Sequence, residues 1–217
     1  MDRFANKRVG IFGGTFDPIH YGHLRSALEV QAIFELQQVR LIPCANPPHR
    51  ELPMTPANLR ADMVELAIAS SPQLLCDRRE LQRTGASYTL ETLQSLRHEL
   101  GETTLLLFIG NDAFAHLTRW YRWRELFAYA HIIVLTRPET ESITDFGDES
   151  DFFANRRASS INELSKTQAG LLWFQAVTPL AISATAIRQL IASGNRPQFL
   201  LPDAVLDYIK QHRLYQT

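Results

Sequence analysis

Short apolar runs alternate along the chain with amphipathic stretches of helical period. Six runs are expected to be strands, and several are apolar enough to be buried on both faces: residues 9–12, 39–42, 74–76, 104–109, 132–135 and 171–175. The stretches between them repeat apolar residues at intervals of three and four, as helices do. Strands that alternate with helices are typical of a parallel sheet with helices on both faces. We therefore expect an α/β fold with a doubly wound, mostly parallel sheet flanked by helices.

The helices are expected from their apolar faces and their end signals. The first three faces are Leu24, Ala27, Leu28 and Ala32; Leu59, Met63, Leu66 and Ala67; and Leu90, Leu93, Leu96 and Leu100, with Gly101 as a stop. Ile187, Leu190 and Ile191 mark a later helix stopped by Gly194, and Pro202 suits the first position of a final helix. Two segments lack this period: residues 43–56, which hold five prolines, and the polar residues 139–168. Both are expected to be long surface loops.

The size and charge of the chain limit what it can be. A chain of 217 residues with a formal charge of -1 fits one compact domain, so we expect residues 1–217 to form a single domain. The balanced charge gives no general attraction to nucleic acid or to a membrane, and neither is expected as a partner. Without a run of about 18 apolar residues or a signal-peptide core, a cytoplasmic protein is expected. Cys44 and Cys76 are lone residues without metal-ligand spacing and are expected to be reduced thiols.

The most informative segment begins where the first strand ends, at Gly13-Gly14-Thr15-Phe16, and runs to His20 and His23 at the start of a helix. Paired glycines let the backbone approach a ligand closely, and a helix N-terminus presents unpaired N–H groups and a positive dipole to a phosphate. Two histidines three residues apart on a first helical turn point the same way and can bind adjacent phosphate oxygens. The segment therefore favours a polyphosphate.

Two familiar nucleotide motifs are excluded by spacing. The segment is not Gly-x-Gly-x-x-Gly, and the second strand leads into Pro43-Cys44-Ala45-Asn46 without an acidic residue to hold a ribose diol. A redox dinucleotide is therefore not expected. There is no Gly-Lys-Ser or Gly-Lys-Thr, and the three lysines, Lys7, Lys166 and Lys210, leave no phosphate-binding lysine for a P-loop.

The segment resembles the mark of the nucleotidyltransferase superfamily, His-x-Gly-His after the first strand, with its Rossmann-like fold. The second mark, Ser-x-Thr-x-x-Arg opening a late helix, stands here as Ser183, Thr185 and Arg188. Ala184 replaces a serine found in many relatives, which removes one hydroxyl from that element. Within the superfamily, nearly the whole chain resembles the bacterial nicotinate-nucleotide adenylyltransferases, and the resemblance implies that late helices, about residues 183–217, complete the ATP site.

This resemblance implies transfer of the adenylyl group of ATP to nicotinate mononucleotide, in NAD biosynthesis, with Mg²⁺ carried mainly by ATP. It implies that His20 and His23 bind the α to γ phosphates and that Arg188 binds the leaving pyrophosphate, supported by amides at the helix N-terminus. The implied ATP site consists of Gly13, Gly14, Thr15, Phe16, His20, His23, Gly110, Asp112, Ser183, Thr185 and Arg188. The implied mononucleotide site consists of Asn46, His49, Arg50, Thr89, Trp120 and Tyr121, with the pyridine ring on Trp120 and its carboxylate held by the amides of Thr89 and Tyr121.

Each of these features has a purely structural alternative. Trp120-Tyr121 could be core, Ser87, Thr89, Ser183 and Thr185 could cap helices, Asp112 could be a helix N-cap, and Asp17 is expected to shape the turn before Pro18 through its side chain. The cluster Arg78-Arg79-Glu80 is expected to be a solvated surface. Two other functions also stay open: a pantetheine-phosphate adenylyltransferase or cytidylyltransferase of the same superfamily, and a non-catalytic nucleotide-binding regulatory module.

Overall fold

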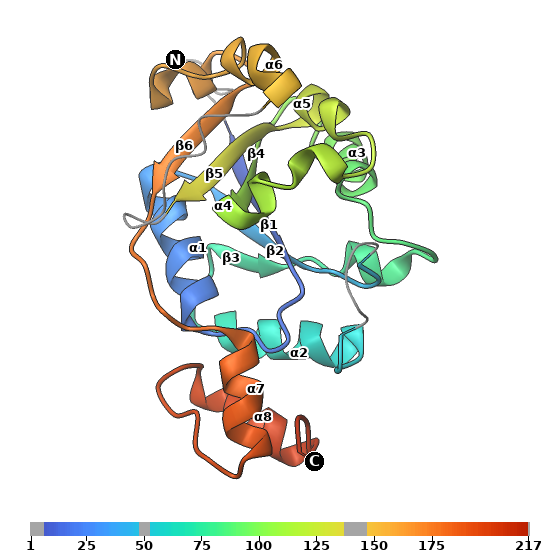
Figure 1. Cartoon of the computed structure of the whole chain (residues 1–217), viewed down its shortest axis with the longest axis vertical. Coiled ribbons are helices and arrows are strands. Elements are labelled where there is room, and N and C mark those ends of the chain that lie inside the picture. The colour runs from blue at the N-terminus through green and yellow to red at the C-terminus, as the bar shows by residue number, and fades with distance from the viewer. Residues whose placement is uncertain (1–6, 48–52, 137–146, 217) are drawn as a thin grey trace. The chain divides into compact units, whose positions relative to one another are not determined.

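The computed structural model describes residues 7–47, 53–136 and 147–216 and contains one six-stranded sheet. Its strands are β1 (Arg8–Gly14), β2 (Gln38–Pro43), β3 (Leu74–Cys76), β4 (Thr104–Gly110), β5 (His131–Thr136) and β6 (Leu172–Ala176). The strand order is β3-β2-β1-β4-β5-β6, and β4 pairs in parallel with β1 and β5, as β5 does with β6. All six expected strands and the parallel α/β architecture are confirmed (Figure 1).

Eight α-helices lie in the described part of the chain. They are α1 (Tyr21–Ile33), α2 (Ala57–Ile68), α3 (Thr89–Leu100), α4 (Asn111–Phe114), α5 (Leu126–Tyr129), α6 (Ser150–Ala154), α7 (Ala184–Ala192) and α8 (Asp203–Gln211). The expectation of a loop over 139–168 was wrong in its described part, because a 3₁₀ turn at Gly147–Glu149, α6 and a second turn at Ile161–Ser165 occupy it. Pro202 is the N-cap of α8 and not its first residue, one position earlier than expected.

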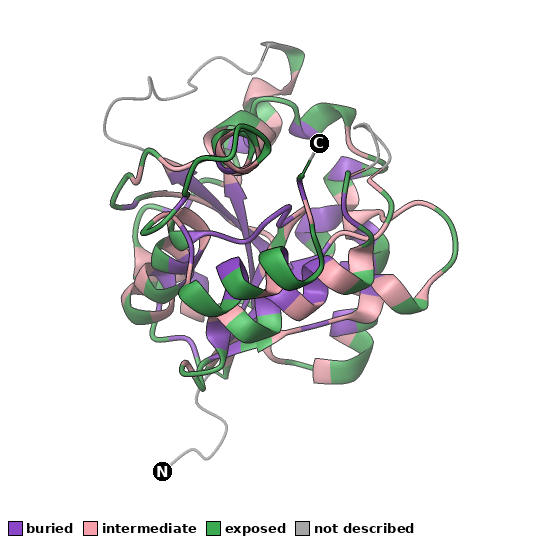
Figure 2. Ribbon diagram, turned by 90° about the horizontal axis from the view of Figure 1, so that it is seen from below, coloured by how far each residue is buried: buried purple, intermediate pink, exposed green. Residues whose placement is uncertain are grey.

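The buried faces of the first two helices differ from those expected. In α1, Leu28 is 38% exposed, and in α2, Leu66 is 39% exposed. The inner face of α2 instead carries Arg60, whose side chain is fully buried, beside Met63 and Val64. Figure 2 shows buried, intermediate and exposed residues alternating along the helices. In α2, the face expected from apolar residues alone is wrong because the buried Arg60 takes one of the inner positions.

The chain contacts divide it into two compact units. The first unit comprises Met1–Phe12, Val30–Val39 and Tyr88–Val177, and the second comprises Gly13–Glu29, Arg40–Ser87 and Thr178–Thr217. The chain passes from one unit to the other within β1, α1 and β2, so these three elements contribute to both units. The expectation of a single domain stays a prediction.

The core of the first unit is formed around β4 and β5, whose residues are almost all buried. In β1, Gly10 is required by close packing, because a Cβ there would lie 2.7 Å from the Phe108 ring and 2.8 Å from the Leu36 side chain. A second group of aromatic rings gathers around Phe153, with Trp123 stacked on it at a centroid distance of 5.2 Å. This group holds α6 in place, which explains why a polar segment is helical.

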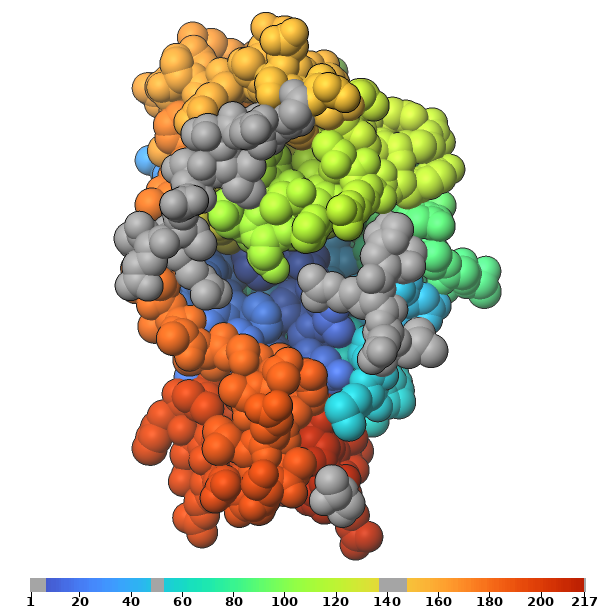
Figure 3. Space-filling model, viewed as in Figure 1, coloured from blue at the N-terminus to red at the C-terminus, as the bar shows by residue number. Residues whose placement is uncertain are grey.

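In the second unit, α2 packs against α8 and β3. The apolar side of α8 is buried through Val205, Leu206 and Ile209. At the edge of this contact the Tyr208 hydroxyl donates a hydrogen bond to Asp62 Oδ2 at 2.7 Å. Figures 1 and 3 show α7 and α8 in orange and red beside the cyan residues of α2. The late helices are therefore part of the unit that contains the glycine-rich segment after β1.

Candidate active site

The loop after β1 has a conformation that only particular residues allow. Phe16 has a left-handed backbone, with φ of 47°, and its side chain is 1% exposed. A Cβ on Gly14 would lie 2.8 Å from the Phe16 ring, so glycine is needed for this packing. A Cβ on Gly13 would meet nothing within 4 Å. The buried Phe16 side chain therefore holds the loop, and the space beside Gly13 is open.

His20 and His23 lie together at the start of α1, as their spacing predicts. Their rings stack with centroids 3.7 Å apart and an angle of 23° between them, and the edge of Phe16 supports His23 at 5.1 Å. Gly22 fits between the histidines because a Cβ there would lie 3.0 Å from the His20 ring. This contact gives a packing reason for glycine in the His-x-Gly-His pattern.

The His23 imidazole is neutral in the absence of ligand. Burial, and secondarily the nearby His20, lower the pKa of His23 from 6.5 to about 3. Its Nδ1 atom is buried and has no hydrogen-bond partner among the residues that the structure describes. A buried polar atom without a partner is costly, and an anion beside the ring would favour the protonated form. The site is thus suited to accept a negatively charged ligand.

The main-chain amides at the start of α1 are mostly engaged within the chain. Tyr21 N–H donates to Leu200 O at 3.0 Å, and the N–H groups of His23 and Leu24 both donate to His20 O. The imidazoles are therefore more available to a ligand than these three amides, although the sequence suggested that helix-terminal amides would assist.

Arg188 reaches the same loop from the late helix α7. Its Nη1 donates to Asp17 O at 2.7 Å, three residues before His20, and its Nη2 donates to Thr185 Oγ1 at 3.3 Å. Ser183 is the N-cap of α7, where its hydroxyl accepts from Ala186 N–H at 3.1 Å, so the capping prediction for Ser183 is confirmed. The structure therefore brings the guanidinium and the first loop together.

Sequence reasoning missed Arg60, which holds this loop from α2. Its guanidinium donates to Thr15 O at 2.5 Å and to Cys44 O at 2.6 Å, and its Nε donates to Thr55 O at 2.9 Å. The side chain is 1% exposed, and burial lowers its pKa below the usual value for arginine. An arginine on the inner face of an amphipathic helix was the only sequence signal for this contact.

Asn46 is held in place by the segment before α3. Its main chain exchanges hydrogen bonds with Ser87, through Asn46 N–H to Ser87 Oγ at 3.1 Å and Ser87 N–H to Asn46 O at 2.8 Å. Its side-chain Nδ2 donates to Gly85 O at 2.9 Å. His49 and Arg50, also expected near the mononucleotide, lie outside the described residues.

The residues expected around the pyridine ring lie in the first unit. Tyr121 is 44% exposed and Trp120 is half-buried, so the alternative that this pair is core is wrong. The Tyr121 ring packs on the ring of Tyr88, with centroids 4.5 Å apart. Thr89 is the first residue of α3, and neither it nor Ser87 caps that helix through a side chain. The aromatic pair is thus accessible at the surface of its unit.

Gly110 and Asp112 follow β4, as expected. Gly110 is the N-cap of α4 and Asp112 lies in its first turn, so the alternative that Asp112 is the N-cap is wrong. The Asp112 side chain is folded back over Gly110, because a Cβ on that glycine would lie 2.7 Å from Asp112 Oδ1. The exposed Asp112 carboxylate therefore lies over Gly110, at the carboxyl end of the strand.

Two expectations about charged residues were wrong. The Asp17 carboxylate does not shape its own turn but accepts from Met54 N–H at 3.2 Å and from the Tyr215 hydroxyl at 2.5 Å. Arg79 and Glu80 are not part of a solvated surface: Arg79 Nη2 lies 2.7 Å from Asp77 Oδ2, and Glu80 is 7% exposed. In both cases the partners are distant in sequence or buried by tertiary packing, which local pattern does not reveal.

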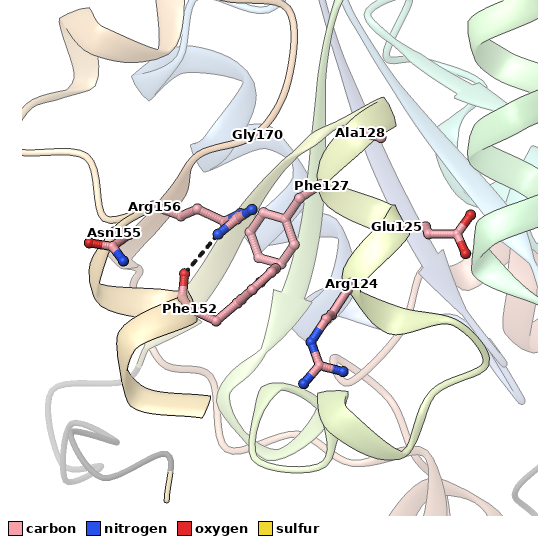
Figure 4. Close-up of a pocket in the computed structure, with 8 residues that line it drawn as sticks. All are labelled: Arg124, Glu125, Phe127, Ala128, Phe152, Asn155, Arg156 and Gly170. Carbon is pink, nitrogen blue, oxygen red and sulfur yellow. Dashed lines mark hydrogen bonds between the residues drawn. The ribbon is translucent and has the colours of Figure 1, made fainter. Parts of the chain in front are cut away.

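A hollow of about 610 Å³ lies in the first unit, and none of the residues expected to bind substrate lines it. It is lined by Arg124, Glu125, Phe127, Ala128, Phe152, Asn155, Arg156 and Gly170 (Figure 4). The Arg156 guanidinium lies 3.7 Å from the centre of the Phe152 ring and donates to Phe152 O at 3.1 Å. The same guanidinium lies 5.6 Å from the centre of the Phe127 ring in α5, so contacts within the protein account for this arginine.

Neither a metal-binding cluster nor a membrane-spanning helix lies in the described ranges. Residues 7–47, 53–136 and 147–216 contain no group of three or more His, Cys, Asp or Glu side chains that could hold a metal ion. None of the helices placed in those ranges is long and apolar enough to cross a bilayer.

Cys44 and Cys76 are both free thiols, and burial raises their pKa values to about 11 and about 12.

The fold, the loop after β1 and the late arginine define the class of cytidylyltransferase-like proteins, whose family model matches residues 11–190. Relatives in Pseudomonas aeruginosa and Methylococcus capsulatus, each described as a probable nicotinate-nucleotide adenylyltransferase, are 48% and 44% identical to this chain. The alignments cover 97% and 95% of this chain and 98% and 99% of those proteins. The chain belongs to the nicotinate-nucleotide adenylyltransferase family.

A solved structure has the same fold at low sequence identity. The Plasmodium falciparum nicotinic acid mononucleotide adenylyltransferase, complexed with NaAD, matches with a TM-score of 0.71 and 18% identity. The match covers 97% of this chain and 98% of that one. The Rossmann-like fold expected from the resemblance is therefore confirmed.

Proposed function

We propose that this chain transfers the adenylyl group of ATP to nicotinate mononucleotide, giving nicotinate adenine dinucleotide and pyrophosphate. An oxygen of the mononucleotide 5'-phosphate bonds to the α-phosphorus of ATP. The bond from that phosphorus to the oxygen bridging toward the β-phosphate breaks, and pyrophosphate leaves with the electron pair. Because the second pKa of a phosphate monoester is about 6, the attacking oxygen is already ionised at neutral pH and no protein base is required.

The observation that carries the proposal is the meeting of His20, His23 and Arg188 around one loop. The ring centroids of His20 and His23 are 3.7 Å apart. Arg188 Nη1 lies 2.7 Å from the main-chain oxygen of Asp17, which precedes His20 by three residues. In adenylyl transfer the difficulty is charge, since two polyanions must align while negative charge grows on the leaving pyrophosphate. We assign the histidines to the triphosphate and Arg188 to the leaving group, whose planar donor fork suits phosphate oxygens.

Mg²⁺ belongs to the substrate in this proposal. The described residues offer no cluster of three metal-ligating side chains. Mg²⁺ commonly keeps several waters and binds through substrate phosphates, so it is expected to arrive with ATP. Gly13, Gly14, Thr15 and Phe16 would line the ATP phosphates or adenosine, together with Gly110, Asp112, Ser183 and Thr185.

The pyridine end of the second substrate is assigned to residues of the first unit. We propose that the pyridine ring stacks on Trp120 and that the main-chain N–H groups of Thr89 and Tyr121 hold its carboxylate. Two donors match a carboxylate, which only accepts hydrogen bonds, whereas a carboxamide turns its own N–H group toward one of them. Asn46, with His49 and Arg50, would meet the mononucleotide phosphate. The acid should therefore be used in preference to the amide.

Pyrophosphate release tests this assignment directly. Purified protein is mixed with ATP, Mg²⁺ and either nicotinate mononucleotide or nicotinamide mononucleotide, and 4'-phosphopantetheine serves as the substrate of the alternative adenylyltransferase. We expect release with the nicotinate compound at a kcat/KM at least tenfold above that with the amide, because an unmatched buried donor costs about 1–3 kcal/mol. Release only with phosphopantetheine would reassign the substrate, and no release with any acceptor would favour a regulatory module. A cytoplasmic location and the absence of nucleic-acid and membrane partners stay predictions.

A further inference from the structure

Asp17 is contacted by three segments that are far from it in the sequence. Its Oδ2 accepts from Met54 N–H at 3.2 Å, and its Oδ1 accepts from the Tyr215 hydroxyl at 2.5 Å across a separation of 198 residues. Its main-chain oxygen accepts from Arg188 Nη1 at 2.7 Å. The side chains of Asp17 and Tyr215 are 6% and 7% exposed. Asp17 therefore joins the loop after β1 to the segments before α2, in α7 and after α8.

The hydrogen bond from the Tyr215 hydroxyl is the shortest that the Asp17 carboxylate accepts. A buried carboxylate has lost its water and depends on protein donors, and a hydrogen bond to a charged group is among the stronger kinds. Burial and the adjacent carboxylate raise the pKa of Tyr215 well above its usual 10, so its hydroxyl stays protonated and donates at any neutral pH. The contact is thus a permanent feature of the folded unit.

The position of Asp17 bears on two groups assigned to the triphosphate. Arg188 is oriented by the Asp17 main-chain oxygen, and His20 follows three residues later, where it accepts the first main-chain bonds of α1 from His23 and Leu24. A shift of Asp17 would move both the guanidinium and the start of the helix that carries the imidazoles. In a site that acts by positioning, displacements of about 1 Å reduce the rate strongly.

We propose that Tyr215 is a positioning residue for ATP: its hydroxyl fixes the Asp17 carboxylate and thereby holds Arg188 and the His20 segment in register. This inference rests on the proposed function, because it assigns the positioned groups to the ATP phosphates. Tyr215 itself does not touch substrate in this proposal.

The chain offers a matched control in Tyr208. Its hydroxyl also donates to a carboxylate in the same unit, Asp62 Oδ2 at 2.7 Å, and its pKa is likewise raised, to about 12. Asp62 lies on α2 and also accepts from Arg78, so that contact leads away from the loop after β1. Tyr208→Phe and Tyr215→Phe therefore each remove a tyrosine-to-carboxylate hydrogen bond; the bond of Tyr215 is buried beside the loop after β1, and that of Tyr208 is half-buried on α2.

Steady-state kinetics on the two variants separates positioning from simple stabilisation. We expect Tyr215→Phe to raise the KM for ATP about tenfold, the scale of losing one hydrogen bond to a charged group, with the KM for nicotinate mononucleotide changed less than about twofold. Tyr208→Phe should leave both constants within about twofold of the parent protein. If Tyr215→Phe lowered the melting temperature but kept the parent KM for ATP, the proposal would be overturned.

Amide hydrogen exchange without any nucleotide keeps this test independent of the proposed function. We expect faster exchange over residues 13–24 in Tyr215→Phe and unchanged exchange there in Tyr208→Phe. Unchanged exchange in Tyr215→Phe would overturn the inference even if the parent enzyme uses both substrates, whereas a parent protein without turnover would overturn the function alone.

A second variant applies if Tyr215→Phe does not fold. Asp17→Asn keeps the shape of the side chain but offers a single acceptor oxygen for the two donors at Met54 and Tyr215. It should also raise the KM for ATP about tenfold and speed exchange over residues 13–24. A parent-like KM for ATP in Asp17→Asn would refute the role of this contact.

Discussion

Replacing Arg60 by alanine removes the donor from one buried main-chain oxygen, at Thr55, and from two part-buried ones, at Thr15 and Cys44. The guanidinium makes bonds of 2.5 Å to Thr15 O, 2.6 Å to Cys44 O and 2.9 Å to Thr55 O, with a longer contact of 3.5 Å to Ala45 O. A buried acceptor left without its partner costs about 1–3 kcal/mol. Taking the low value for the three short bonds, because water can enter the vacated space, Arg60→Ala should lower the free energy of unfolding by about 3 kcal/mol.

The same change should weaken ATP use, because Thr15 lies between the paired glycines and Phe16 in the proposed phosphate loop. We expect the KM for ATP to rise about tenfold in the fraction that remains folded, while the KM for nicotinate mononucleotide changes less. Arg60→Lys should give an intermediate result, since one ammonium group cannot match a planar fork that reaches three carbonyls.

Arg97 provides the matched control in the first unit. Its guanidinium also serves main-chain carbonyls, with Nη1 bonding to Gly101 O at 2.6 Å and Thr103 O at 2.7 Å, and Nη2 bonding to Tyr129 O at 2.7 Å. Arg97 is less buried than Arg60, so solvent can replace more of these bonds, and Arg97→Ala should cost about 1–2 kcal/mol. It should leave the KM for ATP unchanged.

Urea unfolding followed by fluorescence, with ATP kinetics on the same preparations, decides the matter. The reasoning is refuted if Arg60→Ala loses less than about 1 kcal/mol, since even one unmet buried acceptor should cost that much. It is also refuted if Arg60→Ala and Arg97→Ala change the KM for ATP equally, because the loss would then come from general destabilisation.

Three further predictions concern histidines. His20→Ala or His23→Ala should each lower kcat about 100-fold, and near-parent turnover in both would exclude their assigned role. Burial lowers the pKa of His23 to about 3 without ligand, and a bound phosphate should raise it. ATP should therefore bind more tightly as the pH falls toward the usual histidine value of 6.5 and below it, with proton uptake seen by calorimetry in two buffers. Burial lowers the pKa of His131, so the free energy of unfolding should fall below about pH 6.5, where the unfolded chain takes up a proton that the folded chain does not. In urea titrations between about pH 7.5 and 5.5, His131→Gln should remove up to about 1.4 kcal/mol of this loss. Equal losses in the parent protein and in His131→Gln would contradict the prediction.

The sheet could be predicted from sequence because its strands are continuous apolar runs. β4 and β5 are buried on both faces, so neither needs an alternating pattern, and all six expected strands lie within two residues of the observed bounds. The short helix α6 could not be predicted, because its five residues are too few to show a helical period. Phe152 and Phe153 are helical because they pack on Trp123 and Phe127, which precede them by more than 20 residues.

The candidate site was predictable where its residues are adjacent in sequence. His20 and His23 lie within one turn, and Ser183, Thr185 and Arg188 lie within six residues at the start of α7, so spacing alone places each set on one element. Arg60 and Tyr215 could not be found in this way. Arg60 bonds to main-chain oxygens, which exist at every position, and Tyr215 bonds to a carboxylate 198 residues away.

That separation constrains how the protein is made in the cell. The second unit combines residues 13–29 with residues 178–217, so its packing cannot be completed until residue 215 has left the ribosomal tunnel. The histidine segment is therefore synthesised well before Arg188 and Tyr215, and Tyr215 follows Asp17 by 198 residues. Nascent chains halted before that point should carry both imidazoles yet bind ATP poorly, and folding should be slow because it closes long loops.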